Sequence, residues 1–255
     1  MNYAVIDWDN TLRQGFALFT WIEYLREHNI FDKKMDKMIT SLLENHKSGK
    51  VSYKELSSIA SRLYSEGIKG ITPAELGLQV KNYLPIEEAH MYAFSEKIFN
   101  LLEAYDVKAV VVSGSPKIII NEYTERFNLD DIYALTTQEY SGKYTGEVED
   151  TFGHDKGRAI DILVKKYGAM PLLALGDSIA DLDLLHAAKY GYWIKDSDQD
   201  VADDSIPVLH AKDTEHILHA IRAILDQHKD TRNSSSDRYL SPRNTQFRQR
   251  RVAMA

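Results

Sequence analysis

The pattern of apolar and polar positions changes twice along the chain. Residues 3–7 form a short, almost continuous apolar run, which is typical of a strand buried on both faces. Apolar residues then recur every three or four positions, and this spacing predicts helices over 16–28, 31–46, 52–66, 73–83 and 86–105. After Asp106 short apolar runs alternate with helical patterns, which indicates an α/β protein with a mostly parallel sheet.

The alternating part of the chain predicts a definite order of elements. Strands are expected over 107–112, 132–136, 171–175, 190–194 and 207–210. Helices are expected over 115–126, 155–167, 179–188 and 214–227. A hairpin is expected over 138–148, turning at residues 141–143, with a second turn near Gly146. From Arg232 onward the sequence is rich in Ser, Arg, Asn and Gln with little periodicity, which predicts disorder.

Helical patterns fill the stretch between the first predicted strand and the next one. A crossover between parallel strands needs only about a dozen residues, and this stretch is several times longer. The surplus predicts an inserted all-helical module.

Two carboxylates, Asp7 and Asp9, stand at the end of the first predicted strand. Side chains alternate in an extended segment, so these two point to the same side. Such a pair is tolerated if a cation lies between the carboxylates or if one of them keeps a proton. Both conditions suit phosphoryl transfer, in which one carboxylate attacks phosphorus, the other handles the proton of the leaving oxygen, and a metal offsets the charge.

Polar residues also follow two later predicted strands. Ser113 comes after the strand at 107–112, and Asp177 after the strand at 171–175. Ligands of parallel sheets bind beyond the carboxyl ends of the strands, so Asp7, Ser113 and Asp177 are expected to share one site. Asp181 would lie one helical turn beyond Asp177.

Four stretches in this order resemble the motifs of the haloacid dehalogenase (HAD) superfamily. They are Asp7-Trp8-Asp9-Asn10-Thr11, Val111-Val112-Ser113-Gly114, Lys156 within residues 153–157, and the stretch 175–181. The chain is most similar to the phosphoserine-phosphatase-like branch, whose helical cap is inserted after the first motif. The resemblance implies a Rossmann-like core over 1–14 and 95–227, a helical cap over 15–94, and a basic, disordered tail over 228–255.

The resemblance also implies an activity: a Mg²⁺-dependent phosphomonoester hydrolase with an aspartyl-phosphate intermediate. Asp7 would be the nucleophile, Asp9 the general acid and then base, and Lys156 the counter-charge for the transferred group. The Mg²⁺ ligands would be Asp7, the Asp9 backbone carbonyl, Asp177 and Asp181. Phosphate and substrate contacts would come from Thr11, Ser113, Gly114 and Phe16.

Two positions depart from the phosphoserine phosphatases. Phe16 stands where those enzymes carry a glutamate that reads the substrate amine, and Ala180 stands where they have an asparagine. We therefore expect a small phosphorylated metabolite other than phosphoserine. A phosphoryl transferase or mutase using the same intermediate, and a non-catalytic phosphate-binding regulatory module, stay open as alternatives.

The composition limits the kinds of partner that we expect for this protein. A net charge of −7 gives no reason to expect nucleic acid or a membrane surface, although the last 28 residues carry seven basic and two acidic side chains. Without cysteine there is no disulfide framework and no thiolate metal site. The N-terminus lacks a signal-peptide pattern and no apolar run approaches the ~18 residues of a membrane span, so a cytoplasmic location is expected. The expected partner is a small phosphorylated substrate; the oligomeric state is left open.

Overall fold

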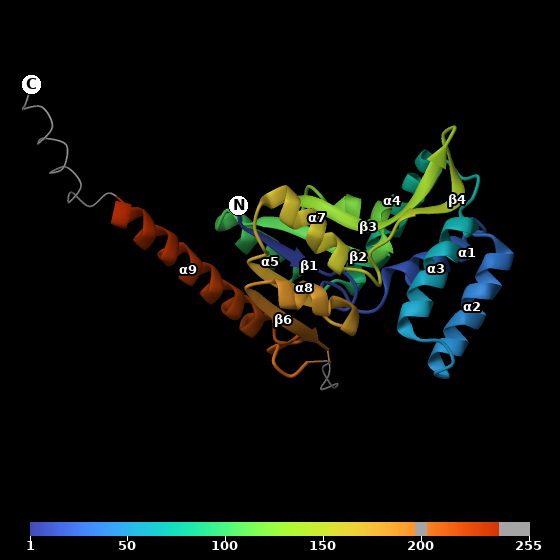
Figure 1. Ribbon diagram of the computed structural model, residues 1–255. Helices are drawn as coiled ribbons and strands as arrows, with labels where there is room; N and C mark the ends of the chain where they lie inside the picture. The colour runs from blue at the N-terminus through green and yellow to red at the C-terminus, as the bar shows by residue number, and fades with distance from the viewer. Residues whose placement is uncertain (197–202, 240–255) are drawn as a thin grey trace, which may run out of the picture.

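The computed structural model describes residues 1–196 and 203–239, with side chains described up to residue 230 (Figure 1). Its strands form a seven-stranded sheet in the order β4-β3-β2-β1-β5-β6-β7. Neighbouring strands are parallel except for the antiparallel pair β3 and β4. The strands are β1 (Tyr3–Ile6), β2 (Lys108–Pro116), β3 (Leu129–Tyr140), β4 (Lys143–Asp150), β5 (Leu173–Gly176), β6 (Tyr190–Lys195) and β7 (Val208–His210).

Strand β1 lies in the middle of the sheet and is covered on both faces. Its residues Ala4 and Ile6 belong to an apolar cluster with α5 (Ser95–Ala104) and α9 (Thr214–Tyr239). Tyr3 and Val5 belong to a second cluster, with α7 (Gly157–Tyr167) and α8 (Leu182–Ala187). Coverage on both faces explains why the run is apolar without alternation, and it confirms the predicted α/β class.

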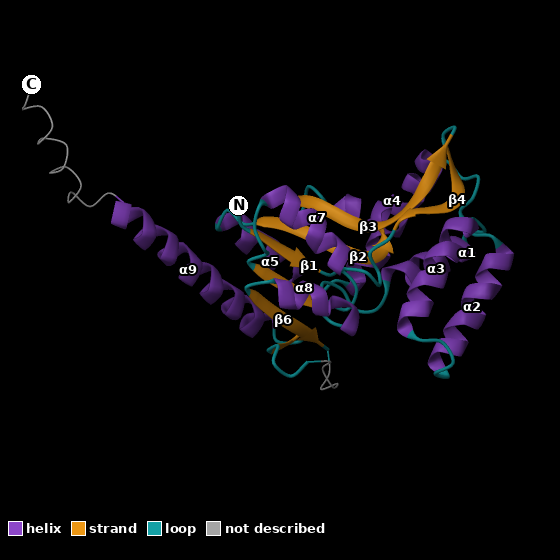
Figure 2. Cartoon of the chain, in the orientation of Figure 1, coloured by secondary structure: helices purple, strands orange, loops and turns teal. Residues whose placement is uncertain are grey.

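Five described helices lie between β1 and β2; the last, α5, packs on the sheet, and the first four form the insertion. Figure 2 shows α1–α3 grouped at one end of the molecule. The inserted helices build an apolar cluster of their own, which also contains Ile119, Leu135 and Tyr144 from the sheet domain. The capping boxes of Ser52 with Glu55 and of Thr72 with Glu75 begin the third and fourth helices. The helices are α1 (Ala17–Glu27), α2 (Lys33–Lys47), α3 (Tyr53–Gly67) and α4 (Pro73–His90).

Several boundaries differ from the prediction. Helix α4 continues through Pro85 to His90, because Tyr83 and Glu87 on either side of the proline are fully buried and hold it in place. The helix predicted over 115–126 is reduced to α6 (Lys117–Ile120) and the 3₁₀ turn η1 (Asn121–Tyr123), since β2 runs on through residue 116. The hairpin turns at residues 141–142 as predicted, but the second turn near Gly146 is absent: this residue lies inside β4.

The segment predicted to be disordered from residue 228 is helical as far as residue 239, as part of α9. The reason is that α9 is already nucleated by its buried residues Ile217, Ile221 and Leu225, and extending a formed helix costs little. The sequence also contains no Gly or Pro between Thr214 and residue 239. The remainder of the predicted tail, 240–255, lies outside the described residues. No helix within 1–196 and 203–239 combines the length and apolarity that crossing a bilayer requires.

Candidate active site

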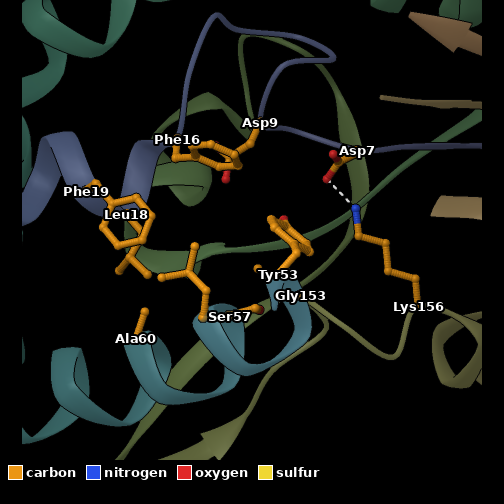
Figure 3. Close-up of a pocket in the computed structure, with 12 residues that line it drawn as sticks. Asp7, Asp9, Phe16, Leu18, Phe19, Tyr53, Ser57, Ala60, Gly153 and Lys156 are labelled. Carbon is orange, nitrogen blue, oxygen red and sulfur yellow. Dashed lines mark ion pairs between the residues drawn. The ribbon is translucent and has the colours of Figure 1, made fainter. Parts of the chain in front are cut away.

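Asp7 lies directly after β1 and forms a buried ion pair. Its backbone N–H donates to the Leu175 carbonyl 3.0 Å away, so it is still held by β5. The Lys156 ammonium, at the residue before α7, lies 2.6 Å from Asp7 Oδ1 (Figure 3). Burial raises the pKa of Asp7 and Lys156 opposes that rise. Burial would lower the pKa of Lys156, but Asp181 and Asp7 raise it above its ordinary value, so the lysine stays charged.

Asp181 is fully buried and fixes both Lys156 and the loop after β5. Its Oδ1 accepts from the Lys156 ammonium. Its Oδ2 accepts from the backbone N–H groups of Asp177 and Ser178, at 3.0 and 2.9 Å, and from the Ser178 hydroxyl at 3.1 Å. The 3₁₀ turn η2 (Ile179–Asp181) places this carboxylate back over the loop. The spacing of four residues between Asp177 and Asp181 therefore produces a tight, self-capped turn.

A set of hard oxygen donors converges beside this loop. One carboxylate oxygen each from Asp7, Asp177 and Asp181 lies within 4.8 Å of the others. Burial, with Asp181 next to it, raises the pKa of Asp177 to about 7. The Lys195 ammonium donates to the Asp177 backbone carbonyl at 2.5 Å and helps to hold the loop. Three crowded carboxylates with a shortage of positive charge fit a divalent cation such as Mg²⁺, which prefers oxygen ligands.

Asp9 is positioned by the start of α1 and by the end of β2. Its Oδ1 accepts from the Ala17 N–H at 2.8 Å, so Asp9 caps α1, while Oδ2 accepts from the Ser115 hydroxyl at 2.6 Å. Burial raises the pKa of Asp9, against the opposing effects of Arg13 and these hydrogen bonds. A carboxyl group that delivers a proton to a leaving group needs a raised pKa.

A buried polar network lies behind Asp9. The Arg13 and Glu87 side chains are both fully buried, and Arg13 Nε lies 3.0 Å from Glu87 Oε1. Glu87 also accepts from Trp8 Nε1 and from the Tyr83 hydroxyl, each at 2.9 Å. Arg13 Nη1 lies 3.9 Å from Asp9 Oδ1. This network joins the loop after β1 to α4, and therefore links Asp9 to the inserted helices.

The predicted phosphate-binding residues surround the same point. Ser113 is fully buried, and its hydroxyl accepts from the Ser115 N–H at 3.1 Å. A Cβ on Gly114 would lie 2.8 Å from the Gly153 Cα, so only glycine fits there. The Thr11 hydroxyl is buried and makes no hydrogen bond among the described residues.

Asn10 lies in the turn directly after Asp9, and its side chain suits the backbone conformation there. Asn10 has a φ of 53°, in the left-handed region that asparagine enters more readily than most residues. Its side-chain oxygen also accepts from the Gly15 N–H at 2.8 Å, which closes the loop that ends at Phe16. The loop thus directs Phe16 toward Asp9, as Figure 3 shows.

The profile of the haloacid dehalogenase-like hydrolases matches residues 4–186 of the sequence. The chain belongs to this family. No curated protein sequence matches this HAD-like hydrolase.

Solved structures with the same fold include phosphoserine phosphatases. A substrate-bound phosphoserine phosphatase complex is 19% identical over 76% of this chain and 86% of its own, with a TM-score of 0.53. Phosphoserine phosphatase from T. onnurineus is 22% identical over 87% and 94%, with a TM-score of 0.55. A protein of unknown function from Bordetella pertussis Tohama I is 17% identical over 82% and 98%, with a TM-score of 0.68. At these identities the likeness establishes the HAD fold and nothing finer.

The structure brings Asp7, Asp9, Phe16, Gly114 and Lys156 to one pocket of this HAD-like hydrolase, with Asp177 and Asp181 beside Asp7. Ser113 is linked to Asp9 through Ser115, and the structure adds other residues. Arg13, Glu87, Ser115 and Tyr53 were not predicted. The Arg13–Glu87 pair spans 74 positions, so no local pattern marks it. A signal for Tyr53 was present, since it stands directly after the Ser52 helix cap, at the end of α3 that faces the site.

Proposed function

We propose that this HAD-like hydrolase is a Mg²⁺-dependent phosphatase that cleaves a small phosphomonoester through an aspartyl-phosphate on Asp7. The observation that carries the proposal is the buried contact between Asp7 and Lys156, with Asp177 and Asp181 alongside. A cation would be held by Asp7, Asp177, the Asp9 carbonyl and the adjoining Asp181, and when bound it would neutralise the phosphate and the crowded carboxylates.

Asp7 attacks phosphorus through a carboxylate oxygen, and the bond between phosphorus and the ester oxygen breaks. Asp9 delivers its proton to that ester oxygen, so the alcohol leaves neutral. Water then attacks the phosphorus of the aspartyl-phosphate, Asp9 takes a proton from this water, and inorganic phosphate and free Asp7 are regenerated. Asp9 thereby returns to its protonated form, and each cycle consumes one water.

Lys156 and the end of β2 hold the group that is transferred. The ammonium of Lys156 offsets charge on the phosphoryl oxygens while Asp181 keeps it in place. The hydroxyl groups of Thr11 and Ser113 and the N–H of Gly114 donate to the same oxygens. Asp181 therefore acts mainly by orienting Lys156 and the Asp177 loop.

Phosphoserine is an unsuitable substrate for this site. Phe16 lines the space in front of Asp9, where an amine-reading carboxylate would be needed. An aromatic ring offers an ammonium group no counter-charge, so the substrate amine would lose hydration without gaining an ion pair.

The decisive test replaces the proposed nucleophile. Asp7→Asn should lower kcat at least about 1,000-fold with a range of phosphomonoesters, while circular dichroism and the unfolding midpoint stay close to wild type. Asp183→Asn is the control, because Asp183 is an exposed aspartate two residues beyond Asp181 and outside the motif stretch 175–181. Chelation with EDTA should abolish turnover, and added Mg²⁺ should restore it. Full activity in Asp7→Asn would eliminate the proposed mechanism.

A further inference from the structure

A small compartment lies between the inserted helices and the Asp7–Lys156 pair. The side of the compartment formed by residues 16–60 is almost entirely apolar. It consists of Phe16, Leu18, Phe19, Tyr53, Leu56 and Ala60, together with Ser57. Figure 3 shows Phe16, Leu18, Phe19 and Ala60 across the space from Asp7 and Lys156, so they would surround whatever is attached to a bound phosphate.

The charged residues that line this compartment are those assigned to the proposed reaction. Among the described residues that line it, the charged ones are Asp7, Asp9 and Lys156. The inserted helices contribute the Tyr53 and Ser57 hydroxyl groups but no carboxylate, lysine or arginine. An ammonium or carboxylate on the leaving group would therefore be taken out of water with no partner, which is unfavourable.

Three aromatic rings, those of Phe16, Phe19 and Tyr53, form part of the apolar side of the compartment. The ring centroids of Phe16 and Phe19 are 6.0 Å apart at an interplanar angle of 77°, and those of Phe16 and Tyr53 are 6.3 Å apart at 38°. Phe16 is the N-cap residue of α1, but its side chain makes no capping hydrogen bond. Its side chain is 36% exposed, which leaves a large apolar surface uncovered next to the site.

The compartment is closed by a tight contact between the insertion and the core. A Cβ on Gly153 would lie 2.4 Å from the Ser57 hydroxyl, so α3 approaches the loop before Lys156 as closely as a glycine permits. The apolar wall is thus held against the site rather than standing away from it, and a leaving group must fit beneath it.

We propose that this compartment selects phosphate esters of uncharged, largely apolar alcohols, with Phe16 and Tyr53 as the residues that choose them. The proposal rests on the proposed phosphatase activity and gives it a substrate class. Aromatic faces also attract quaternary ammonium groups, but the described residues of the insertion supply no carboxylate to accompany such a cation. A preference for phosphocholine would therefore contradict the proposal.

Kinetics with esters of similar primary alcohols test the selection. The probes are benzyl phosphate, methyl phosphate, phosphoserine, phosphoethanolamine and phosphocholine, each with Mg²⁺. The kcat/KM for benzyl phosphate should exceed that for each charged ester roughly 100-fold. The apolar wall favours the benzyl group, and the charged groups would be buried without a partner. Phe16→Ala and Tyr53→Ala should each lower kcat/KM for benzyl phosphate about tenfold more than they lower it for methyl phosphate, whose alcohol offers the rings little apolar surface.

Three further variants sharpen the result. Tyr53→Phe keeps the ring and should keep the preference. Phe16→Glu should shift the preference toward phosphoethanolamine, since it supplies a counter-charge at a partly exposed position. Tyr140→Ala is the matched control, because Tyr140 is an aromatic residue that is 76% exposed on the hairpin and remote from the compartment.

A binding measurement separates the two proposals. Calorimetry should show benzylphosphonate binding at least tenfold more tightly than 2-aminoethylphosphonate, with the difference lost in Phe16→Ala. If no ester is hydrolysed but this difference is found, the phosphatase assignment fails and the compartment's selectivity stands. If charged esters are hydrolysed best, the activity stands and the selectivity is wrong. If neither phosphonate binds preferentially, the compartment does not select apolar groups.

Discussion

At the scale of single residues, the site is defined by carboxylates whose surroundings assign them different tasks. Asp181 has both oxygens occupied by hydrogen bonds from Lys156 and the loop at 177–178, so it serves as a fixed support. One oxygen of Asp9 accepts a hydrogen bond from the start of α1 and the other accepts one from Ser115, while burial raises the pKa of Asp9. The Asp177 carboxylate, unlike those of Asp7, Asp9 and Asp181, makes no hydrogen bond or ion pair among the described residues. It is therefore the group most affected by a bound cation.

The raised pKa of Asp177 predicts a pH-dependent stability in the metal-free protein. Its folded pKa of about 7 lies above the ordinary 3.8, so the folded state keeps a proton that the unfolded state releases. The associated stability is fully present below pH 3.8 and is lost as pH rises to 7, by on the order of 3 kcal/mol. Urea unfolding in EDTA should show this decline in the wild type, and Asp177→Asn should reduce it.

Mg²⁺ should reverse the trend, because the cation requires ionised Asp177 and competes with its proton. The increase in unfolding midpoint caused by Mg²⁺ should therefore grow as pH passes through 7. A Mg²⁺ effect that is equal at pH 5.5 and 8 would show that Asp177 is not a ligand.

At the scale of elements, the Arg13–Glu87 pair connects the loop after β1 to helix α4. Glu87 accepts from Arg13, Trp8 and Tyr83 with no exposure to solvent. A buried pair contributes less than its contacts suggest, but removing one partner leaves the other charge unpaired. Glu87 is thus a structural link between the insertion and Asp9.

Glu87→Gln should destabilise the protein by about 3–5 kcal/mol, since it removes the counter-charge of Arg13 without removing volume. Glu88→Gln is the control on the next residue: its ion pair with Arg126 is about half-exposed, and its loss should cost at most about 1 kcal/mol. Denaturant unfolding measures both. Equal, small effects would mean that water reaches Arg13.

Local patterns predicted the elements and the residues at strand ends, because both depend on short-range spacing. Thr72 with Glu75 marked a helix start, and Asp7 and Asp177 followed apolar runs at the edge where ligands bind. The passage of α4 through Pro85 could not be predicted, since burial of neighbouring side chains overrode the proline. The same holds for Arg13 and Glu87, whose pairing exists only once the insertion has packed.

At the scale of the whole molecule, three apolar clusters meet around the site, and each contains one fully buried tryptophan. Trp8 belongs to the cluster under α5 and α9, Trp193 to the cluster under α7 and α8, and Trp21 to the inserted helices. The third cluster also includes Ile119 and Leu135 from the sheet domain. The insertion is therefore continuous with the rest of the described structure.

This continuity predicts that the insertion and the sheet domain unfold together. Three variants that each keep one tryptophan, with the other two replaced by phenylalanine, report on the three clusters separately. Within each variant, the urea midpoint from tryptophan fluorescence should coincide with the midpoint from far-ultraviolet circular dichroism. A fluorescence transition of Trp21 that precedes the loss of helix and sheet signal would show that the insertion unfolds alone.

The central place of β1 has a consequence for biosynthesis. Its residue Ala4 pairs with Ala109 on one side and with Leu173 on the other. A ribosome releases β1 first, yet both neighbours emerge much later, and such distant pairings form slowly. The nascent chain therefore carries this apolar segment without either neighbour while residues 7–107 are synthesised, and the second neighbour follows only with β5.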